Sequence, residues 1–388
     1  MTVRTDPEPP ALDTAASPNR RVASLDGIRA VAVIAVMMFH FGQGWIPGGY
    51  IGVDVFFVLS GFLITTLLVQ RAPQPFAVRR FWERRIRRLF PALSLMLAVV
   101  FLYALTVPAL EQTAIRGQGL ATIFYVNNWY LLFSGSTYFA AYQQPSPLLH
   151  TWTLSVEEQF YILLPVILLI VIALRRFTWR PLIWLLAVMA VMSFGWTAWL
   201  AEQGASVERL YFGTDTRAQQ LLLGSLLAVV GARSVASGRP RMAFAGARGG
   251  FAGLCGLSML LAMFILWPEG RLVAVQLPVA AMGSVLLIIG ALDRTSLVGR
   301  WLSWTPLAAI GVISYGLYLW HWPIAVMIGA DQTNATTPVR LLLTVSIATA
   351  SYIWLEKPIR QGRLRLRWLM PVPVILVIMA VVCTPLAS

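Results

Sequence analysis

The sequence predicts an all-α, polytopic helical membrane protein with about 11 transmembrane helices. Of its 388 residues, 58% are hydrophobic and only 12% are charged, and the mean hydropathy is +0.72. Apolar runs long enough to cross a bilayer recur along the whole chain, which is typical of helical membrane proteins rather than of soluble domains. We therefore expect one transmembrane domain over residues 25–388, preceded by a disordered cytoplasmic tail over residues 1–24.

Hydropathy and length place the candidate spans in order along the chain. These spans cover residues 28–46, 50–70, 89–108, 157–174, 181–200, 216–232, 251–267, 272–292, 306–329, 340–355 and 368–385. One further stretch, residues 117–133, is apolar but carries Asn127 and Asn128 at its centre. We expect it to be a re-entrant or interfacial piece of a long outer segment, because non-helical backbone at membrane depth must line a cavity or be buried in protein.

The distribution of positive charge gives the predicted orientation. With the N-terminus inside and eleven spans, 25 of the 30 Lys and Arg residues fall on the cytoplasmic side, as the positive-inside rule requires. Counting residues 117–133 as a span would move fourteen of those charges outside. We therefore predict a cytoplasmic N-terminus and an extracytoplasmic C-terminus. The net charge of +14 is then mostly a topology signal, and nucleic acid is not an expected partner.

Three ionisable residues lie within the first two candidate spans. Arg29 and His40 are eleven residues apart, which at 100° per residue places them within roughly 20° of one helix face, roughly 16 Å apart along the axis. A Gly- and Pro-containing turn then brings Asp54 back near His40. Ionisable groups in hydrocarbon are costly and often functional, and a carboxylate beside a histidine makes the imidazole a base. We therefore expect these three residues to form part of a site.

The third span begins in a dense arginine cluster, RRFWERRIRRLFP over residues 79–91. Its six Arg alternate with apolar residues at helical spacing, which suits an interfacial amphipathic helix on anionic lipid. Arg85 and Arg88 project from one helix face at i, i+3, which equally suits a phosphate-binding patch. The two interpretations are compatible, and both stay open here.

Two later polar stretches add candidate residues in the predicted outer half of the membrane. In LLHTWTLSVEEQFYILLP, residues 148–165, Ser155 with Glu157 and Glu158 would make a good helix start. With His150 close to these carboxylates in the sequence, the stretch nevertheless holds more polar groups than a helix cap requires. His321 lies in GVISYGLYLWHWPI, residues 311–324, where a lone membrane histidine is more often a packed core residue than a functional one.

Several motifs are absent from the sequence. There is no G-x-x-x-x-G-K-[ST] phosphate loop, no C-x-x-C or H-E-x-x-H metal pattern and no G-x-S-x-G nucleophile elbow. The two cysteines, Cys255 and Cys383, fall at opposite predicted membrane faces and are expected to stay unpaired. The sequence therefore favours neither ATP-driven transport nor metal or serine hydrolysis, and we expect no metal.

The motifs taken together resemble membrane-bound acyltransferase family 3, the inner-membrane O-acyltransferases that modify cell-surface polysaccharides and lipids. The resemblance begins with SLDGIRAVAVIAVMMFHF, in which an Arg is followed after ten residues by a His. The further matching segments, in the family's order, are residues 48–65, 79–93, 127–129, 151–165, 313–324 and 352–360. They spread over nearly the whole chain.

The resemblance implies transfer of an acyl group, often acetyl, from cytoplasmic acyl-CoA to a hydroxyl on a sugar. It implies His40 as catalytic base or acyl relay and Arg29 as its assistant. The Arg-x-x-Arg pair of the family aligns with Arg85 and Arg88, which with neighbouring Arg84 would bind the donor.

Three further candidate residues, Glu157, Glu158 and His321, fall in family motifs whose individual roles are less settled. Many members carry an extracytoplasmic hydrolase-like domain after the last helix. The present sequence stops at Ser388, so we expect no such domain in it. A second step would then need a separate extracytoplasmic partner, and a second copy of the chain is the other partner left open.

We expect His40, oriented by Asp54 or by the network of Arg29, to deprotonate the acceptor hydroxyl for direct attack on the thioester. An acyl-histidine intermediate is the competing mechanism. The acceptor stays open among surface polysaccharide, lipid-linked sugar, peptidoglycan and a sugar on a secondary metabolite such as a macrolide. A glycolipid or small-molecule transporter is the alternative from a different class. The expected location is the bacterial cytoplasmic membrane, in contact with its lipids.

Overall fold

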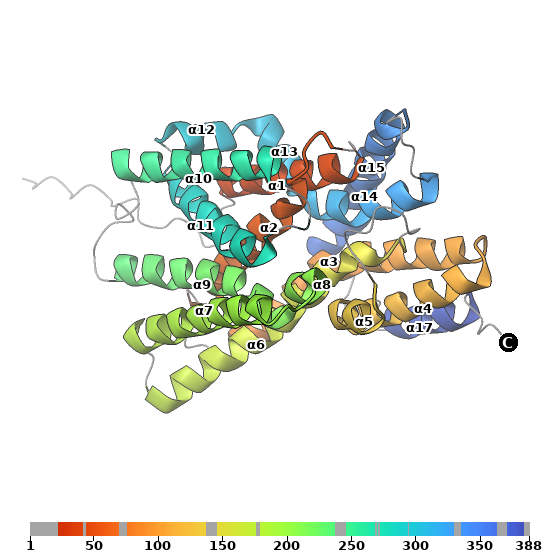
Figure 1. Ribbon diagram of the computed structural model, residues 1–388, viewed down its shortest axis with the longest axis horizontal. Coiled ribbons are helices and arrows are strands. Elements are labelled where there is room, and N and C mark those ends of the chain that lie inside the picture. Colours follow the sequence, from red (N-terminus) through yellow and green to blue (C-terminus); the bar gives the residue numbers. More distant parts are fainter. Residues whose placement is uncertain are drawn as a thin grey trace, which may run out of the picture.

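In the computed structural model, the protein folds into a bundle of helices (Figure 1). The structure describes residues 22–41, 44–69, 76–136, 146–175, 179–236, 246–267, 270, 272–293, 295–329, 335–362 and 371–383. Those residues form helices and connecting turns, and none of them lies in a β-strand. Residues 1–21 of the expected cytoplasmic tail lie outside the described part of the chain.

The helices follow one another with short connections. In the first half they are α1 (Ala23–Phe41), η1 (Gly49–Ile51), α2 (Gly52–Val69), α3 (Phe76–Ala104), α4 (Ala109–Ile123), α5 (Asn127–Phe133), η2 (Leu149–Thr151), α6 (Trp152–Arg175), α7 (Trp179–Glu202) and α8 (Val207–Phe212). In the second half they are α9 (Thr214–Ala236), α10 (Ala247–Leu266), α11 (Val273–Leu292), α12 (Leu297–Leu302), α13 (Thr305–Val312), α14 (Ser314–Ile328), α15 (Thr337–Ser351), the π-helical turn η4 (Tyr352–Glu356), α16 (Lys357–Arg360) and α17 (Val372–Val382).

The predicted class of integral membrane protein is confirmed. Within the described residues, eight helices are long and apolar enough to cross a membrane, and α13 with α14, bent by 64°, would make a ninth. The expected spans 157–174 and 368–385 coincide with α6 and with the shorter apolar helix α17. The number of eleven spans and the orientation of the two ends stay predictions.

Helices α2 and α11 form the centre of the bundle, with α1 and α10 on one side and α7 and α9 on the other (Figure 1). Glycines allow the close approach of α2 and α9. A Cβ atom added at Gly61 would lie 2.0 Å from the carbonyl oxygen of Leu221, and one added at Gly224 would lie 2.0 Å from that of Val58. Small residues permit such contact between membrane helices, where backbone approach and van der Waals packing replace the hydrophobic effect.

The doubtful stretch 117–133 does not form a single helix. It is divided between α4 and α5, which meet at Tyr125, a non-glycine residue with φ of 55°, and neither helix qualifies as a span. Both Asn127 and Asn128 are fully buried in protein. The expectation that this piece does not span therefore agrees with the structure, and its polar residues are buried as membrane depth demands.

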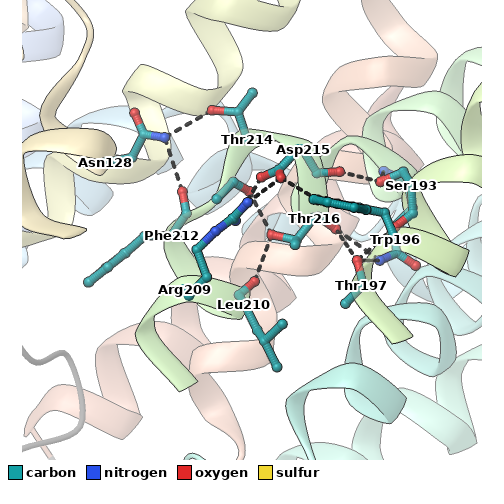
Figure 2. Close-up of polar contacts among 12 residues, drawn as sticks. Asn128, Ser193, Trp196, Thr197, Arg209, Leu210, Phe212, Thr214, Asp215 and Thr216 are labelled. Atoms are coloured by element: carbon teal, nitrogen blue, oxygen red, sulfur yellow. Dashed lines mark hydrogen bonds and ion pairs between the residues drawn. The ribbon is translucent and has the colours of Figure 1, made fainter. Parts of the chain in front are cut away.

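Asn128 ties α5 to the turn between α8 and α9 (Figure 2). Its amide nitrogen donates to the carbonyl oxygen of Phe212 over 3.0 Å and to the hydroxyl of Thr214 over 2.9 Å. Its carbonyl oxygen accepts from the side-chain amide of Gln159 on α6. On the other side of the same turn, Asp215 accepts from Arg209 and from the indole of Trp196 on α7. Five helices, α5 to α9, thus converge on one polar junction.

Candidate active site

An arginine-lined cavity lies between α1, α2, α3, α6 and α14. It has a volume of about 140 Å³, and Arg29, Arg85 and Arg88 contribute to its wall together with Glu157 and Tyr161. The remainder of the wall is mostly apolar. Arg84, which the sequence grouped with the donor-binding arginines, is exposed and is not among the residues that line this cavity.

The three cavity arginines differ in how their charge is balanced. Arg29 forms an ion pair with Asp26 at 2.5 Å. Arg85 forms one with Glu158 at 2.7 Å, and its guanidinium stacks 3.4 Å from the ring centre of Tyr161. Arg88 makes no ion pair with any residue in the described part of the chain, and its side chain stays exposed. It therefore offers the cavity a positive charge that no carboxylate contacts directly among the described residues.

The two glutamates lie inside the protein rather than at a helix end. Helix α6 begins at Trp152, so the expected helix start at Ser155 is wrong. Glu157 accepts a hydrogen bond from Ser60 at 2.9 Å and a longer one from Tyr161 at 3.4 Å. Glu157 belongs to the cavity wall, and Glu158 binds Arg85, so the two glutamates together link α6 to α2 and α3.

His40 and His321 form a directly hydrogen-bonded pair that the sequence did not predict. The Nδ1 atom of His40 lies 3.1 Å from the Nε2 atom of His321. His321 is fully buried, and its Nδ1 atom lies 2.5 Å from the carbonyl oxygen of Tyr318. The indole of Trp322 packs edge-on against His40 with 4.6 Å between ring centres.

The hydrogen bonds set the tautomers of this pair. A carbonyl oxygen can only accept, so Nδ1 of His321 carries the proton and, in the neutral ring, Nε2 accepts. His40 must then donate through its Nδ1–H, which puts the lone pair of the neutral His40 ring on Nε2. His321 therefore prepares Nε2 of His40 to accept a proton.

Asp54 and Arg29 do not take the places that the sequence predicted beside His40. The carboxylate of Asp54 accepts from Arg217 at 2.6 Å and from the amides of Gln220 and Gln276 at 2.8 and 3.3 Å. Asp54 and Arg217 are both fully buried. Arg29 faces the cavity, one helix turn from its partner Asp26. Among the side chains whose hydrogen bonds to His40 are described, His321 is the one in contact with its ring nitrogen.

Sequence reasoning missed Arg217 as the partner of Asp54. Arg217 is an arginine within an otherwise apolar predicted span, and such residues need a counter-charge. That signal was available, although the sequence alone could not say which carboxylate would supply it.

Tyr318 connects the cavity to the histidines. Its ring lines the cavity, its hydroxyl donates to the carbonyl oxygen of His150 over 3.0 Å, and its own carbonyl accepts from His321. The ring centres of His150 and His321 are 5.7 Å apart. All three histidines of the chain therefore gather beside Tyr318, which lies in the wall of the arginine cavity. Among the described residues, no group of histidine, cysteine or acidic residues could hold a metal ion.

Comparisons with known proteins show what the chain as a whole is similar to. A family model described as an acyltransferase domain matches residues 22–386. The chain is 36% identical to the peptidoglycan O-acetyltransferase OatA of Listeria monocytogenes over 353 residues, covering 88% of the chain and 56% of the relative. It is 34% identical to the O-acetyltransferase OatA of Staphylococcus aureus over 355 residues, covering 88% and 58%. The chain thus spans a little over half the length of these relatives, and no solved structure matches it.

Proposed function

This chain belongs to membrane-bound acyltransferase family 3, and from that premise we propose that it moves an acyl group, acetyl in the first instance, from acyl-CoA to a carbohydrate hydroxyl. The observation that carries the proposal is the arginine-lined cavity with Tyr318 in its wall, the residue whose carbonyl accepts from His321 of the His40–His321 pair. A donor held by the arginines would extend its reactive end toward the histidines.

The donor proposal rests on the charge of the cavity. CoA carries several phosphates, and guanidinium groups recognise phosphate through paired, charge-assisted hydrogen bonds. Arg88 lacks an ion pair among the described residues and has Arg29, Arg85 and Arg360 as its cationic neighbours. An anion bound there would relieve the repulsion between these like charges. The apolar remainder of the wall suits the pantetheine arm.

The proposed chemistry is direct attack with His40 as general base. The acceptor oxygen attacks the thioester carbonyl carbon while its proton passes to Nε2 of His40. The tetrahedral intermediate collapses, the carbon–sulfur bond breaks, and the same proton passes to the CoA sulfur. The products are an O-acyl ester and free CoA. A positioned base of this kind contributes about 10² to 10⁴-fold in rate.

An acyl-histidine intermediate on His40 is the competing version of this mechanism. The direct-attack version requires donor and acceptor to be bound together before any product leaves. Ping-pong kinetics, with CoA released before the acceptor binds, would contradict it.

The proposed acceptor is a cell-wall carbohydrate, because the relatives are named as peptidoglycan O-acetyltransferases. The proposed location is the cytoplasmic membrane of a bacterium, where acyl-CoA is available on one face and cell-wall sugars are assembled on the other. On this proposal the acyl group crosses the bilayer while the charged CoA does not.

Turnover by the purified protein tests this function. Labelled acetyl-CoA and peptidoglycan fragments are incubated with the wild type and with His40→Gln, and both CoA release and label on the glycan are measured. We expect release coupled to glycan labelling in the wild type and loss of both in His40→Gln, with acetyl-CoA binding retained. Labelling that survives in His40→Gln would contradict the proposed role of His40.

A further inference from the structure

His150 is a buried histidine whose ring makes no hydrogen bond. Only 3% of the residue is exposed, and neither Nδ1 nor Nε2 has a hydrogen-bond partner in the described part of the chain. The carbonyl groups of Pro147 and Leu319 lie close to the ring, but neither is placed for a hydrogen bond of ordinary geometry. A buried polar group without a partner costs about 1–3 kcal/mol. Such a group needs an explanation in function.

The backbone around His150 is held in place from several sides, so the position of the ring is built into the fold. The hydroxyls of Tyr318 and Thr153 donate to the His150 carbonyl over 3.0 and 3.1 Å. The indole of Trp322 donates to the carbonyl of Ser146 over 2.9 Å, which fixes the preceding turn against α14. The ring then lies edge-on to His321, with 5.7 Å between ring centres.

The ring of His150 is neutral near pH 7. Burial lowers the pKa of His150 well below its usual value, and the neighbouring His321 lowers this pKa further. A neutral imidazole carries one N–H donor and one lone pair whichever tautomer it adopts. His150 therefore brings an uncommitted N–H donor into the histidine cluster, without a positive charge.

Three other donors next to the pair are already committed. The N–H of His321 is bonded to the Tyr318 carbonyl, the Trp322 N–H to the Ser146 carbonyl, and the Tyr318 hydroxyl to the His150 carbonyl. Acyl transfer needs a donor for the carbonyl oxygen of the thioester, because that oxygen becomes negatively charged in the tetrahedral intermediate. A neutral histidine can fill this role, as the neutral imidazole of triosephosphate isomerase illustrates.

We propose that His150 is a second catalytic residue, whose neutral N–H donates a hydrogen bond to the thioester carbonyl oxygen as the acceptor attacks. The inference rests on the proposed function and adds one partner to its chemistry. His40 takes the hydroxyl proton and returns it to the CoA sulfur, whereas His150 keeps its own proton throughout. No oxidant or metal takes part in the step.

Two substitutions separate a hydrogen-bond donor from a base or a packing residue. In His150→Gln the side chain keeps an N–H donor but cannot act as a base at neutral pH, and in His150→Leu it has neither ability. We expect His150→Leu to lower kcat about 100-fold, the cost of losing one oxyanion donor, and His150→Gln to lose about tenfold or less. The KM for acetyl-CoA should change little in either variant. The thermal stability should not fall in either variant.

The outcomes are distinct. Activity of His150→Leu within twofold of the wild type would overturn the inference while leaving the proposed function in place. Equal and severe loss in both variants, with folding and acetyl-CoA binding intact, would overturn it in favour of proton transfer by His150. A wild type without any turnover, tested with several acyl-CoAs and acceptors, would overturn the proposed function itself and this inference with it.

Discussion

At the scale of single residues, the account depends on one hydrogen bond between two imidazoles. His321 accepts from His40, and its own proton is held by a backbone carbonyl that cannot change its protonation state. The arrangement fixes a tautomer without a carboxylate. Tautomer control in hydrolytic triads commonly uses an Asp for this purpose, so a neutral orienting partner is the distinctive feature of this site.

Substitution of His321 tests this control of the tautomer. In His321→Leu the Nδ1–H of His40 loses its imidazole acceptor and keeps the backbone carbonyl of Val36 as a neighbour, and we expect kcat to fall at least tenfold with little change in the KM for acetyl-CoA. In His321→Gln the side-chain carbonyl can still accept from His40, so activity should be partly restored. Steady-state kinetics on both variants provide the measurement. Identical losses in the two variants would show that His321 matters only for packing.

The sequence identified the individual residues of this site better than their partners. The eleven-residue spacing correctly indicated that Arg29 and His40 lie on one helix. In the structure the two side chains have different surroundings, because Arg29 lines the cavity and His40 contacts His321. The pairing of His40 with His321 joins residues 281 positions apart. Helical periodicity carries no information about contacts at that separation, so this partner could not be predicted.

At the scale of helices, the buried Asp54–Arg217 pair joins α2 to α9, and Gln276 adds α11. Both charged groups are fully buried, and in such a pair the removal of one partner leaves an uncompensated charge in the interior. This explains why an aspartate stands in the apolar second span. The partner of Asp54 is Arg217, in a structural ion pair, and not His40 as the sequence indicated.

We expect Asp54→Asn to lower the free energy of unfolding by about 3–5 kcal/mol, because Arg217 is left buried and unpaired. Replacing both residues by apolar ones, as in Asp54→Leu with Arg217→Met, should cost much less. Thermal unfolding of the purified variants in detergent provides the comparison. A double variant less stable than Asp54→Asn would contradict this explanation.

The polar junction of α5 with α8 and α9 gives a second prediction at this scale. Asn128 donates there to Phe212 and Thr214 (Figure 2), and it accepts from Gln159. In Asn128→Leu the buried carbonyl of Phe212 loses a donor, which should lower stability by about 1–3 kcal/mol. Ser134→Ala, at the exposed end of the same helix, serves as the control and should change the melting temperature little. An equal change in melting temperature in Asn128→Leu and Ser134→Ala would contradict a stabilising role of the junction.

The positions of the apolar helices were well predicted from the sequence, whereas the breaks between helices were not. The hydropathy of the chain indicated where apolar helices lie, and two central asparagines correctly argued against a span over residues 117–133. The division of that stretch at Tyr125 has no signal in the sequence, since a tyrosine with positive φ is unusual. The bend between α13 and α14 was also missed, because it falls at Ile313, where no proline marks a break in the sequence.

At the scale of the whole molecule, the excess of arginine on one side predicts how the protein sits in the membrane. Eleven spans with the N-terminus inside leave the C-terminus on the extracytoplasmic side. A reporter that is active only outside the cytoplasm, such as alkaline phosphatase, should therefore be active when fused after Ser388. A cytoplasmic reporter such as a fluorescent protein should be active when fused before Met1. The reverse pattern at Ser388 would contradict the count of eleven.

The central claim at this scale is a division of labour: the arginines that line the cavity bind the donor, and the histidines packed around Tyr318 carry out the transfer. The most direct test compares kcat and the KM for acetyl-CoA in three variants of the full chain. These are Arg88→Gln, His40→Gln and the control Arg84→Gln, in which an exposed arginine of the same helix outside the cavity wall is changed.

We expect Arg88→Gln to raise KM roughly 10-fold or more with kcat little changed, because a charge-assisted hydrogen bond contributes about 1.5–3 kcal/mol. His40→Gln should lower kcat by about 10² to 10⁴-fold with acetyl-CoA affinity retained, and Arg84→Gln should resemble the wild type. A loss of kcat in Arg88→Gln equal to that in His40→Gln, or a KM unchanged by removal of Arg88, would contradict the division of labour.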